Sequence, residues 1–466
     1  MIPMTSRLGV CLGLALLLVG AACPLSAFPI SGDQGILPAG TELNEDALDR
    51  PMELFHSEVS RGGKSYLVNL GDLAFSSPGL FGGPARRVGL SCASCHVNGA
   101  SNAKLYVPGM STHPGNFDTT GGFFNPPADD GVLDPLTIPS LRGARYLAPY
   151  GHDGRIASLR EFIRNVIVNE FAGPEPSPAI VDAIVTYLQD IDFLPDPLIG
   201  AGGRLTEKAS AAAHRGEALF NKPFPGNPML SCAACHVPSA AFVDHRQHDV
   251  GTGGLFKTPT LLNAKFNAPY FHDGRFADFD NVVAYFDKTF ALGLSAEDRQ
   301  DLIAYLSAIG DGVAPVTPDG VDPRLKEIRD FSSVLATAIP AKDQEVIALA
   351  ADTIGGELRE FSEHFPDRFD KTVSGGLKER AAARLALKEL VLSLRKLATS
   401  AEADDFAGAA AEYTAYEDRL AKIVPTLKAA EPWSLFNPTV HDAHYAGLRE
   451  MVYAAGKETH AANSGN

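Results

Sequence analysis

Apolar residues recur at three- and four-residue spacing along the C-terminal third of the chain. In one stretch, Leu387, Leu390, Val391, Leu394 and Leu397 would share one face of a helix. Prolines and glycines separate or end four stretches of this kind, at residues 342–365, 378–397, 403–424 and 440–455. The pattern predicts an antiparallel helical bundle over residues 314–466.

Earlier in the chain, two segments are copies of each other. Residues 139–155 align without gaps on residues 259–275, and ten of the seventeen positions are identical. A short helical pattern follows each copy, at residues 184–188 and 302–306. A repeat of this length indicates a duplicated domain and not a solenoid unit.

Each copy also contains the sequence Cys-x-x-Cys-His, once at Cys92, Cys95 and His96 and once at Cys232, Cys235 and His236. Two thiols at this spacing can add to the vinyl groups of one haem, and the adjacent histidine then reaches the iron as proximal ligand. A zinc site is the alternative, but it usually needs a second cysteine pair a few tens of residues away. Because Cys95 and Cys232 are 137 residues apart, we expect two covalently bound haem c groups.

These motifs define the fold class that we expect, which is mainly α: two tandem cytochrome c-type domains followed by an antiparallel helical bundle. The boundaries are a signal peptide over 1–27, a first cytochrome c domain over 28–200, a second over 201–313 and a bundle domain over 314–466. Residues 194–204, which carry two prolines and three glycines, form the linker between the copies.

The N-terminus indicates export. Arg7 precedes an apolar run over residues 8–22, and Ala27 offers a small residue for cleavage before Phe28. We therefore expect a periplasmic protein; a lipid anchor at Cys23 is disfavoured because Gly20 stands where leucine is usual. No later stretch is long and apolar enough for a transmembrane span. The formal charge of −16 argues against nucleic acid or an anionic membrane surface as partner.

With these motifs in hand, residues 28–312 resemble the bacterial dihaem cytochrome c peroxidase/MauG family. The similarity is most specific in the second copy, in residues 242–244, 248–251, 256–261 and 268–274; the helical tail lies outside it. The resemblance implies one haem through which electrons enter and one at which hydrogen peroxide reacts, with a cytochrome c or cupredoxin as electron donor. It also allows a calcium ion between the haem domains.

The resemblance also suggests the remaining ligands of the irons. The position fourteen residues after His272, where the family has methionine or tyrosine, is Phe286, which cannot ligate iron. Tyr285 and His272 itself are therefore the candidates at the second haem. At the first haem, His113 matches the family's displaceable distal histidine, and Met110 lies in the same loop.

Other family positions have changed. Glu161 matches the glutamate that moves a proton between the peroxide oxygens, after Arg160. Tyr150 replaces the family's glutamine, and the bridging tryptophan is missing, because Trp433 in the tail is the only tryptophan.

Structural roles compete with these assignments. His152 and His272 occur in identical His-Asp-Gly-Arg contexts, where the imidazole can bind a loop carbonyl, the aspartate can cap a helix and the arginine can bind a haem propionate. His248 is better interpreted as a contact near the haem than as an iron ligand. His364, His441 and His444 are better interpreted as surface or core-edge residues.

Together these observations predict a cytochrome c peroxidase-like oxidoreductase that reduces hydrogen peroxide to water. Two alternatives stay open: MauG-like oxidation of a side chain on a partner protein, and non-catalytic electron transfer through two six-coordinate haems. A vacant coordination site separates both enzymes from the carrier.

Overall fold

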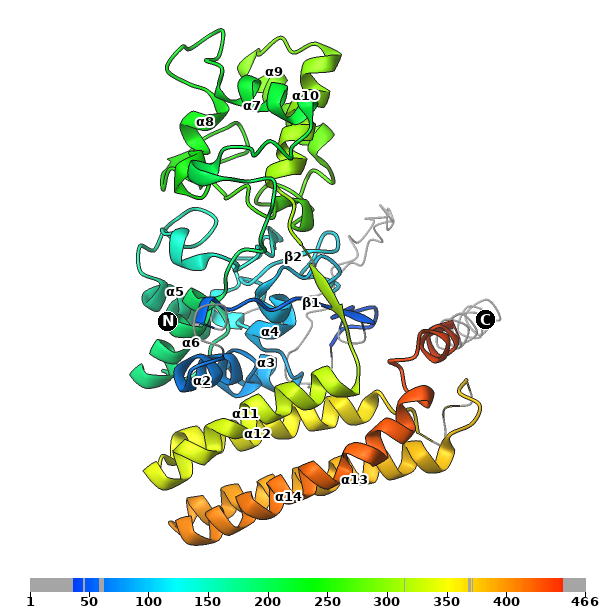
Figure 1. The fold of residues 1–466 in the computed structure, drawn as a ribbon. Coiled ribbons are helices and arrows are strands. Elements are labelled where there is room, and N and C mark those ends of the chain that lie inside the picture. Colours follow the sequence, from blue (N-terminus) through cyan, green and yellow to red (C-terminus); the bar gives the residue numbers. More distant parts are fainter. Residues whose placement is uncertain are drawn as a thin grey trace, which may run out of the picture.

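The computed structural model describes residues 37–44, 47–57, 63–313, 315–367, 370 and 372–446. The predicted signal peptide at residues 1–27, the expected first residue Phe28, and Cys11 and Cys23 lie outside these residues. The described chain is mainly helical, as predicted, and its strands form three short two-stranded sheets (Figure 1). None of the described helices is long and apolar enough to cross a membrane.

The first copy is built on two crossing helices, α2 (Tyr66–Phe75) and α6 (Pro178–Asp190). Ser65 and Ser177 cap their N-termini, each accepting a backbone N–H through its hydroxyl. The helices approach most closely at Gly71, where a Cβ atom would lie 2.0 Å from the carbonyl oxygen of Ala183. The shorter helices of this copy are α3 (Gly83–Arg87), α4 (Cys92–Cys95) and α5 (Leu159–Asn165), which continues into a π-helical turn, η6 (Val166–Glu170).

The second copy repeats this arrangement with α7 (Ala211–Asn221) and α10 (Ala296–Ile309). Their crossing lies at Gly216, where a Cβ atom would stand 2.0 Å from the carbonyl oxygen of Asp301. Between them lie α8 (Cys232–Cys235) and α9 (Phe279–Phe290). Each copy of the repeat thus contains the same close helix crossing, which depends on a glycine.

The two copies exchange backbone hydrogen bonds. In the first, β2 (Asn116–Phe117) pairs with β3 (Leu136–Thr137), and in the second β4 (Gln247–His248) pairs with β5 (Phe256–Lys257). The N–H of Thr137 donates to the carbonyl of His272 (2.7 Å), and the N–H of Lys257 donates to that of His152 (2.9 Å). Each copy's short sheet therefore touches the other's His-Asp-Gly-Arg turn.

Four long helices follow: α11 (Val321–Ala341), α12 (Gln344–Glu363), α13 (Leu377–Glu402) and α14 (Phe406–Ala430). Three correspond to predicted stretches, whereas α11 was not among them. Pro425 was predicted to end a helix, but α14 runs through it to Ala430. The predicted helix at 440–455 is described only to residue 446.

Buried apolar residues form two clusters. The larger joins the first copy to α11–α14 and includes Leu73 of α2 and Phe331 of α11, both fully buried. The smaller belongs to the second copy and includes Phe242 and Tyr305. In Figure 1 the helices α11–α14 lie against the first copy, at the end of the molecule away from the second copy. The segments on the two sides of the predicted boundary at 313/314 thus lie in different clusters, and the bundle shares its core with the first copy, from which the second copy separates it in sequence.

Shorter elements connect these parts. Strand β1 (Asp49–Pro51) pairs antiparallel with β6 (Val316–Pro318), just before α11. The 3-10 turns are η2 (Pro78–Leu80), η3 (Val97–Gly99), η4 (Pro126–Ala128), η5 (Ala144–Tyr146), η7 (Ala201–Gly203), η8 (Pro238–Ala240), η9 (Ala264–Phe266) and η10 (Glu431–Trp433).

Candidate haem-binding sites

In the first copy, Cys92 and Cys95 begin and end the single helical turn α4, and His96 follows directly. The Ser91 N–H donates to Ser94 Oγ (3.1 Å) and fixes the start of this turn. His96 Nδ1 lies 3.0 Å from the carbonyl oxygen of Pro139. A carbonyl can only accept, so Nδ1 carries the proton and Nε2 keeps its lone pair for a metal. Burial lowers the pKa of His96 to about 4, which keeps the imidazole neutral.

The second copy has the same geometry. His236 Nδ1 lies 3.2 Å from the carbonyl oxygen of Phe242, and burial again lowers the pKa of the histidine. The rings of Phe75 and His96 are 6.4 Å apart with an interplanar angle of 44°, and the rings of Phe220 and His236 have the same values. Both candidate proximal histidines therefore face equivalent phenylalanines at the same angle, although their Nδ1 atoms lie beside carbonyls at different positions of the repeat.

The four cysteines lie in two separate pairs, one in each copy. Burial raises the pKa of Cys92 and of Cys95 to about 12 and that of Cys232 to about 11, so in the absence of a metal these thiols are protonated. None of these four cysteines forms a disulfide with another described residue. Each copy thus offers two protonated thiols on one turn and a neutral imidazole, which is the donor set that covalent haem attachment uses.

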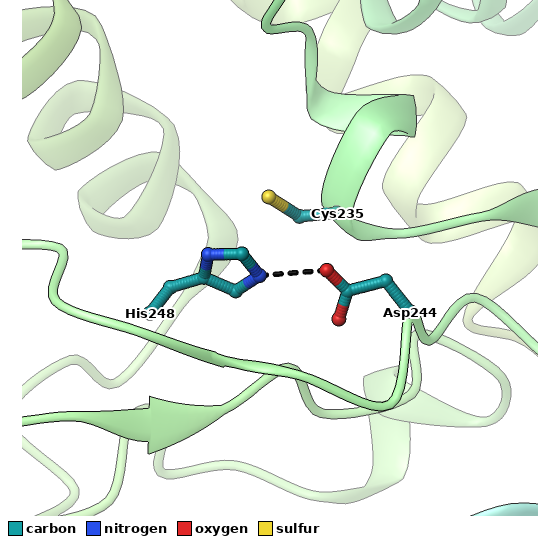
Figure 2. Close-up of side chains that lie close together, drawn as sticks. All are labelled: Cys235, Asp244 and His248. Atoms are coloured by element: carbon teal, nitrogen blue, oxygen red, sulfur yellow. Dashed lines mark hydrogen bonds and ion pairs between the residues drawn. The ribbon is translucent and has the colours of Figure 1, made fainter.

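Among the described residues, one group of three potential metal-ligating side chains lies close together: Cys235, Asp244 and His248. Figure 2 shows that Asp244 and His248 face each other, and His248 Nε2 lies 2.6 Å from Asp244 Oδ2. Because Cys235 is a candidate haem thioether, the remaining feature is a His–Asp pair beside that attachment point. This position agrees with the interpretation of His248 as a contact near the haem.

His113 lies at the contact between the copies. Its Nε2 is 3.0 Å from the carbonyl oxygen of Asp273, and its Nδ1 is 2.9 Å from that of Pro114. A Cβ atom on Gly274 would lie only 2.5 Å from the imidazole ring. The role of His113 as a ligand of the first iron stays a prediction. Met110, 2 % exposed, packs in the core of the first copy.

Glu161 lies in the first turn of α5, with its side chain exposed. Its backbone N–H donates to Ser158 Oγ (3.4 Å), so the cap of this helix is Ser158 and not the expected Asp153. Among the described residues, no recorded contact joins Glu161 to His96. Its catalytic role stays a prediction.

A second carboxylate, which the sequence did not single out, lies at the end of the same helical segment. Glu170 is 16 % exposed and accepts from Arg155 Nη2 (2.7 Å) and Asn165 Nδ2 (3.1 Å). Burial raises its pKa, although Arg155 opposes the shift. It ends the π-helical turn η6, a distortion that is frequent at functional sites. One extra residue in a helical turn leaves no clear sequence signal.

The two candidate ligands of the second haem lie in an aromatic cluster. The ring of His272 stacks on Phe256 at 3.7 Å with an interplanar angle of 11°. Tyr285, on α9, donates its hydroxyl to the carbonyl of Val250 (2.7 Å), and its ring is 5.2 Å from that of Phe271. Phe286 packs on the same ring at 5.6 Å. To bind iron, Tyr285 would have to give up its hydrogen bond to Val250, whereas stacking on Phe256 does not engage the ring nitrogens of His272. The role of each as a ligand stays a prediction.

The residues of the His-Asp-Gly-Arg turns make local polar contacts. His152 Nε2 lies 3.2 Å from Thr137 Oγ1, and burial, together with Lys257, lowers its pKa to about 4. Arg155 pairs with Asp153 and Glu170, and Arg275 pairs with Asp273. These arginines pair with carboxylates of the protein, and their expected contact with a haem propionate stays a prediction. In α9 the capping residue is Asp278, not the expected Asp273.

The histidines of the tail are engaged locally. His364, 5 % exposed, lies with Nδ1 3.1 Å from the carbonyl oxygen of Glu360, and its ring stacks on Phe436 at 4.5 Å. His444 Nδ1 lies 2.6 Å from Asp370 Oδ2. His441 lies beside Asp442, with 3.4 Å between Nδ1 and Oδ1. These contacts agree with roles at the core edge and the surface.

Comparison with known proteins shows which proteins these segments resemble. Residues 210–376 match the family model for di-haem cytochrome c peroxidase, a range that includes α11 and α12 and so extends beyond the expected limit at residue 312. Hydrazine synthase subunit gamma of Kuenenia stuttgartiensis is 26 % identical over 316 residues, which cover 55 % of this chain and 78 % of that protein.

Other relatives match shorter segments. The methylamine utilization protein MauG of Methylophilus methylotrophus is 28 % identical over 24 % of this chain and 41 % of its own length. Cytochrome-c peroxidase IdrP1 of Pseudomonas sp. (strain SCT) is 37 % identical over 12 % of this chain and 18 % of its own length. A solved hydrazine synthase structure from Kuenenia stuttgartiensis aligns with a TM-score of 0.38 at 21 % identity, over 64 % of this chain and 100 % of that one. The resemblance to the dihaem cytochrome c peroxidase/MauG family is confirmed by the sequence matches.

Proposed function

We propose that this chain, with its confirmed resemblance to the dihaem cytochrome c peroxidase/MauG family, is a periplasmic dihaem c-type cytochrome that reduces hydrogen peroxide to water. Its electrons would come from a small redox protein, a cytochrome c or a cupredoxin. The supporting observation is the duplicated arrangement of two thiols on one helical turn followed by a histidine whose Nδ1 is bound to a carbonyl. Haem c, when bound, supplies an iron that exchanges electrons and binds peroxide.

Haem attachment is tested first. Acid–acetone extraction should leave the colour with the polypeptide, and pyridine haemochrome should give two haems per chain, held by His96 and His236. Changing Cys232 and Cys235 to alanine should remove one haem and leave the spectrum of the first domain. One haem per chain, or haem that is extracted by acid–acetone, would contradict the proposal.

In the proposed division of labour, peroxide reacts in the first copy. His113 is the proposed displaceable ligand there, and Glu161 is proposed to move the proton between the peroxide oxygens. In the second copy His272 or Tyr285 is proposed as the sixth ligand. The proposal also includes a calcium ion between the two copies, which the family resemblance suggests.

Glu170 is a second candidate for the proton transfer. Its carboxylate is sheltered and held by Arg155, whereas Glu161 is exposed, and a sheltered group of raised pKa suits general acid–base catalysis. The test compares Glu161→Gln and Glu170→Gln with Glu175→Gln, which alters an exposed ion pair of Arg164 on the same segment. Substitution of the residue that moves the proton should lower the rate of peroxide turnover by a factor of about 10²–10⁴ and leave the haem content unchanged. Full activity in both variants, or reaction at the His236 haem alone, would overturn the assignment to the first copy.

Non-catalytic electron transfer is the second candidate. The observation that favours it is the exposure of Glu161, the carboxylate that the family resemblance assigns to proton transfer. The ferric spin states decide between the two: a peroxidase should show one high-spin haem, and a carrier should show two low-spin haems. MauG-like oxidation of a partner protein would share the high-spin signal and differ in the electron donor that supports turnover.

A further inference from the structure

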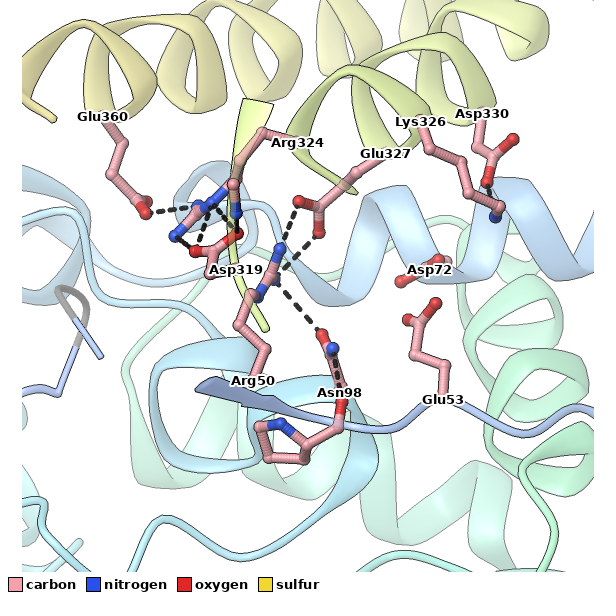
Figure 3. A network of polar contacts seen from close by, with 12 residues as sticks. Arg50, Glu53, Asp72, Asn98, Asp319, Arg324, Lys326, Glu327, Asp330 and Glu360 are labelled. Carbon is pink, nitrogen blue, oxygen red and sulfur yellow. Dashed lines mark hydrogen bonds and ion pairs between the residues drawn. The ribbon is translucent and has the colours of Figure 1, made fainter. Parts of the chain in front are cut away.

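A chain of polar contacts leads from the bundle to the first candidate haem site. Arg50, on β1, binds Glu327 of α11 with two hydrogen bonds, of 2.7 Å and 3.1 Å. The same guanidinium donates to Asn98 Oδ1 at 3.2 Å, and Asn98 Nδ2 donates to the carbonyl of Pro51 at 2.8 Å. Figure 3 shows these three side chains in line between α11 and the turn that carries Asn98.

Asn98 stands two residues after His96 and holds a strained part of the backbone. Its φ of 50° lies in the left-handed region, which asparagine tolerates better than most residues. The side chain is held from both ends, by Arg50 and by the Pro51 carbonyl. The turn that follows the proximal histidine thus has its conformation fixed by strand β1, and through Arg50 by α11.

The chain of contacts is sheltered from solvent. Arg50 and Glu327 are 17 % and 20 % exposed, and the adjoining Arg324 and Asp319 are 6 % and 1 % exposed. Burial opposes ionisation of Glu327, but Arg50 and Arg324 lower its pKa to about 2, so the pair with Arg50 is ionic. Charges in such surroundings act over longer distances than surface charges do, because water and salt screen them less.

Further ion pairs bind the same surfaces. Lys64 of the first copy, 6 % exposed, lies 3.0 Å from Asp72 of α2, 3.2 Å from Glu53 and 3.8 Å from Asp330 of α11. Arg324 of α11 pairs with Asp319 (2.8 Å) and Glu360 (2.6 Å). Since α11 also shares the apolar core of the first copy, it is fixed against that copy and cannot move independently of it while these contacts persist.

The second copy has no equivalent of this link among the described residues. The position two residues after His236 is Pro238, which has no side-chain hydrogen-bonding group, and the helices α11–α14 share no apolar cluster with that copy. Two proximal sites that agree in their ring geometry therefore differ in their outer contacts. That difference supplies an internal control.

We infer that the C-terminal bundle acts on the first haem centre. Glu327, Arg50 and Asn98 are positioning residues: they fix the turn after His96 and set the charge environment of the haem that His96 would hold. The inference rests on the proposal that His96 holds a haem. It assigns to the bundle the regulation of one of the two haems, and it does not depend on peroxide as the substrate.

Charge changes test the electrostatic part. In a background with Cys232 and Cys235 changed to alanine, the first haem is titrated alone. Arg50→Gln removes a positive charge and should lower its reduction potential, because the ferric form carries one more positive charge. Glu327→Gln should raise the potential. We expect about a tenfold change in the one-electron equilibrium constant, or ~59 mV. Arg160→Gln, which breaks the exposed pair with Asp182 in the same copy, should change neither.

Hydrogen exchange tests the positioning part. Asn98→Gly keeps a residue that tolerates positive φ but removes both side-chain hydrogen bonds, so it should speed amide exchange in residues 92–100 while α11 stays folded. Arg50→Gln should speed exchange in both segments, and Arg160→Gln in neither. Asn98→Gly also serves if Arg50→Gln does not fold.

Two results would overturn the inference: unchanged exchange in residues 92–100 of Asn98→Gly, or potentials that do not move in opposite directions in the two charge variants. Failure of the proposed function has a different signature. A missing first haem would appear in the haemochrome count, and a protein without peroxide turnover could still show both the potential shifts and the exchange changes.

Discussion

At the scale of single residues, the duplicated domain offers pairs of equivalent side chains in different surroundings. Tyr187 and Tyr305 both pack on the phenylalanine that faces the proximal histidine, with ring distances of 5.2 Å and 4.9 Å. Burial and the nearby Asp72 carboxylate, which the Tyr187 hydroxyl can reach, raise the pKa of Tyr187. The Tyr305 hydroxyl is buried without a hydrogen-bond partner among the described residues.

The two tyrosines should therefore respond differently to loss of the hydroxyl. Tyr187→Phe should lower the free energy of unfolding by about 1 kcal/mol, the net value of a typical hydrogen bond. Tyr305→Phe should leave it unchanged or raise it, because an unsatisfied buried hydroxyl costs about 1–3 kcal/mol. Urea unfolding followed by the Soret band, with haem content as the control, measures both. Equal losses in the two variants would contradict the assigned hydrogen bond.

His152 predicts a pH dependence of stability. Its folded pKa is about 4, below the usual value of about 6.5. Between these values the unfolded chain binds the proton and the folded chain does not, so stability falls as the pH drops from about 6.5 to 4, by up to ~1.4 kcal/mol per pH unit. His152→Gln should flatten this part of the curve relative to the unchanged protein. His214→Gln is the control, because the side chain of this histidine is 41 % exposed. If His214→Gln flattened the curve to the same extent, the pH dependence could not be assigned to His152.

How far the sequence predicted the sites also depends on the residue. The CxxCH residues could be found because attachment chemistry fixes their spacing within a single helical turn. The distal residues could not be placed in the same way. His113 and His272 owe their positions to contacts between the two copies, 160 residues apart in the case of His113 and Asp273, and local spacing carries no record of such contacts. Glu170 was missed because its shelter comes from Arg155 and from a π-helical turn.

At the scale of elements, the helix crossings carry the repeat. Gly71→Ala and Gly216→Ala would each place a Cβ atom 2.0 Å from a backbone carbonyl oxygen, which neither helix can avoid without moving. We expect each variant to lose haem in its own copy, as measured by pyridine haemochrome. Gly356→Ala on α12 is the matched control: the nearest atom to its Cβ would be Arg359 Nη2 at 3.8 Å, and stability should rise by up to about 1 kcal/mol. Normal haem content in both crossing variants would show that the helices can separate without loss of the sites.

Helix α11 shows why element prediction was incomplete. Pro323, Ser332-Ser333 and Pro340 resemble loop punctuation, but each is accommodated in the helix. Pro323 lies in the first turn, where its missing N–H costs nothing. The Ser332 hydroxyl donates to the carbonyl of Ile328 at 2.7 Å. Pro340 falls in the last turn. Pro425 is similar, since packing of α14 on α13 outweighs the loss of one backbone hydrogen bond.

At the scale of the whole molecule, composition and periodicity predicted four long helical stretches but not where they pack. The ion pair between Arg50 and Glu327 joins residues 277 positions apart. A pattern of apolar residues at helical spacing carries no information about contacts between residues so far apart in the sequence. The consequence is that the tail packs on the first copy: its apolar residues and those of the first copy lie in one cluster, while the second copy keeps its own.

This unequal sharing predicts an unequal response to truncation. A chain that ends at Gly312 would uncover the face of α2 that α11 and α12 cover, and would leave Arg50 and Lys64 without their partners on α11. We expect the first haem to be lost or its Soret band to shift, with aggregation through the exposed apolar surface, while the second copy retains its haem. Haemochrome counts on chains with and without the Cys232→Ala and Cys235→Ala changes separate the two sites, and a chain ending at residue 446 is the control. A soluble dihaem protein with an unchanged Soret band would show instead that the first copy folds and binds haem without the bundle, and the link through Arg50 would then be a contact without influence on the site.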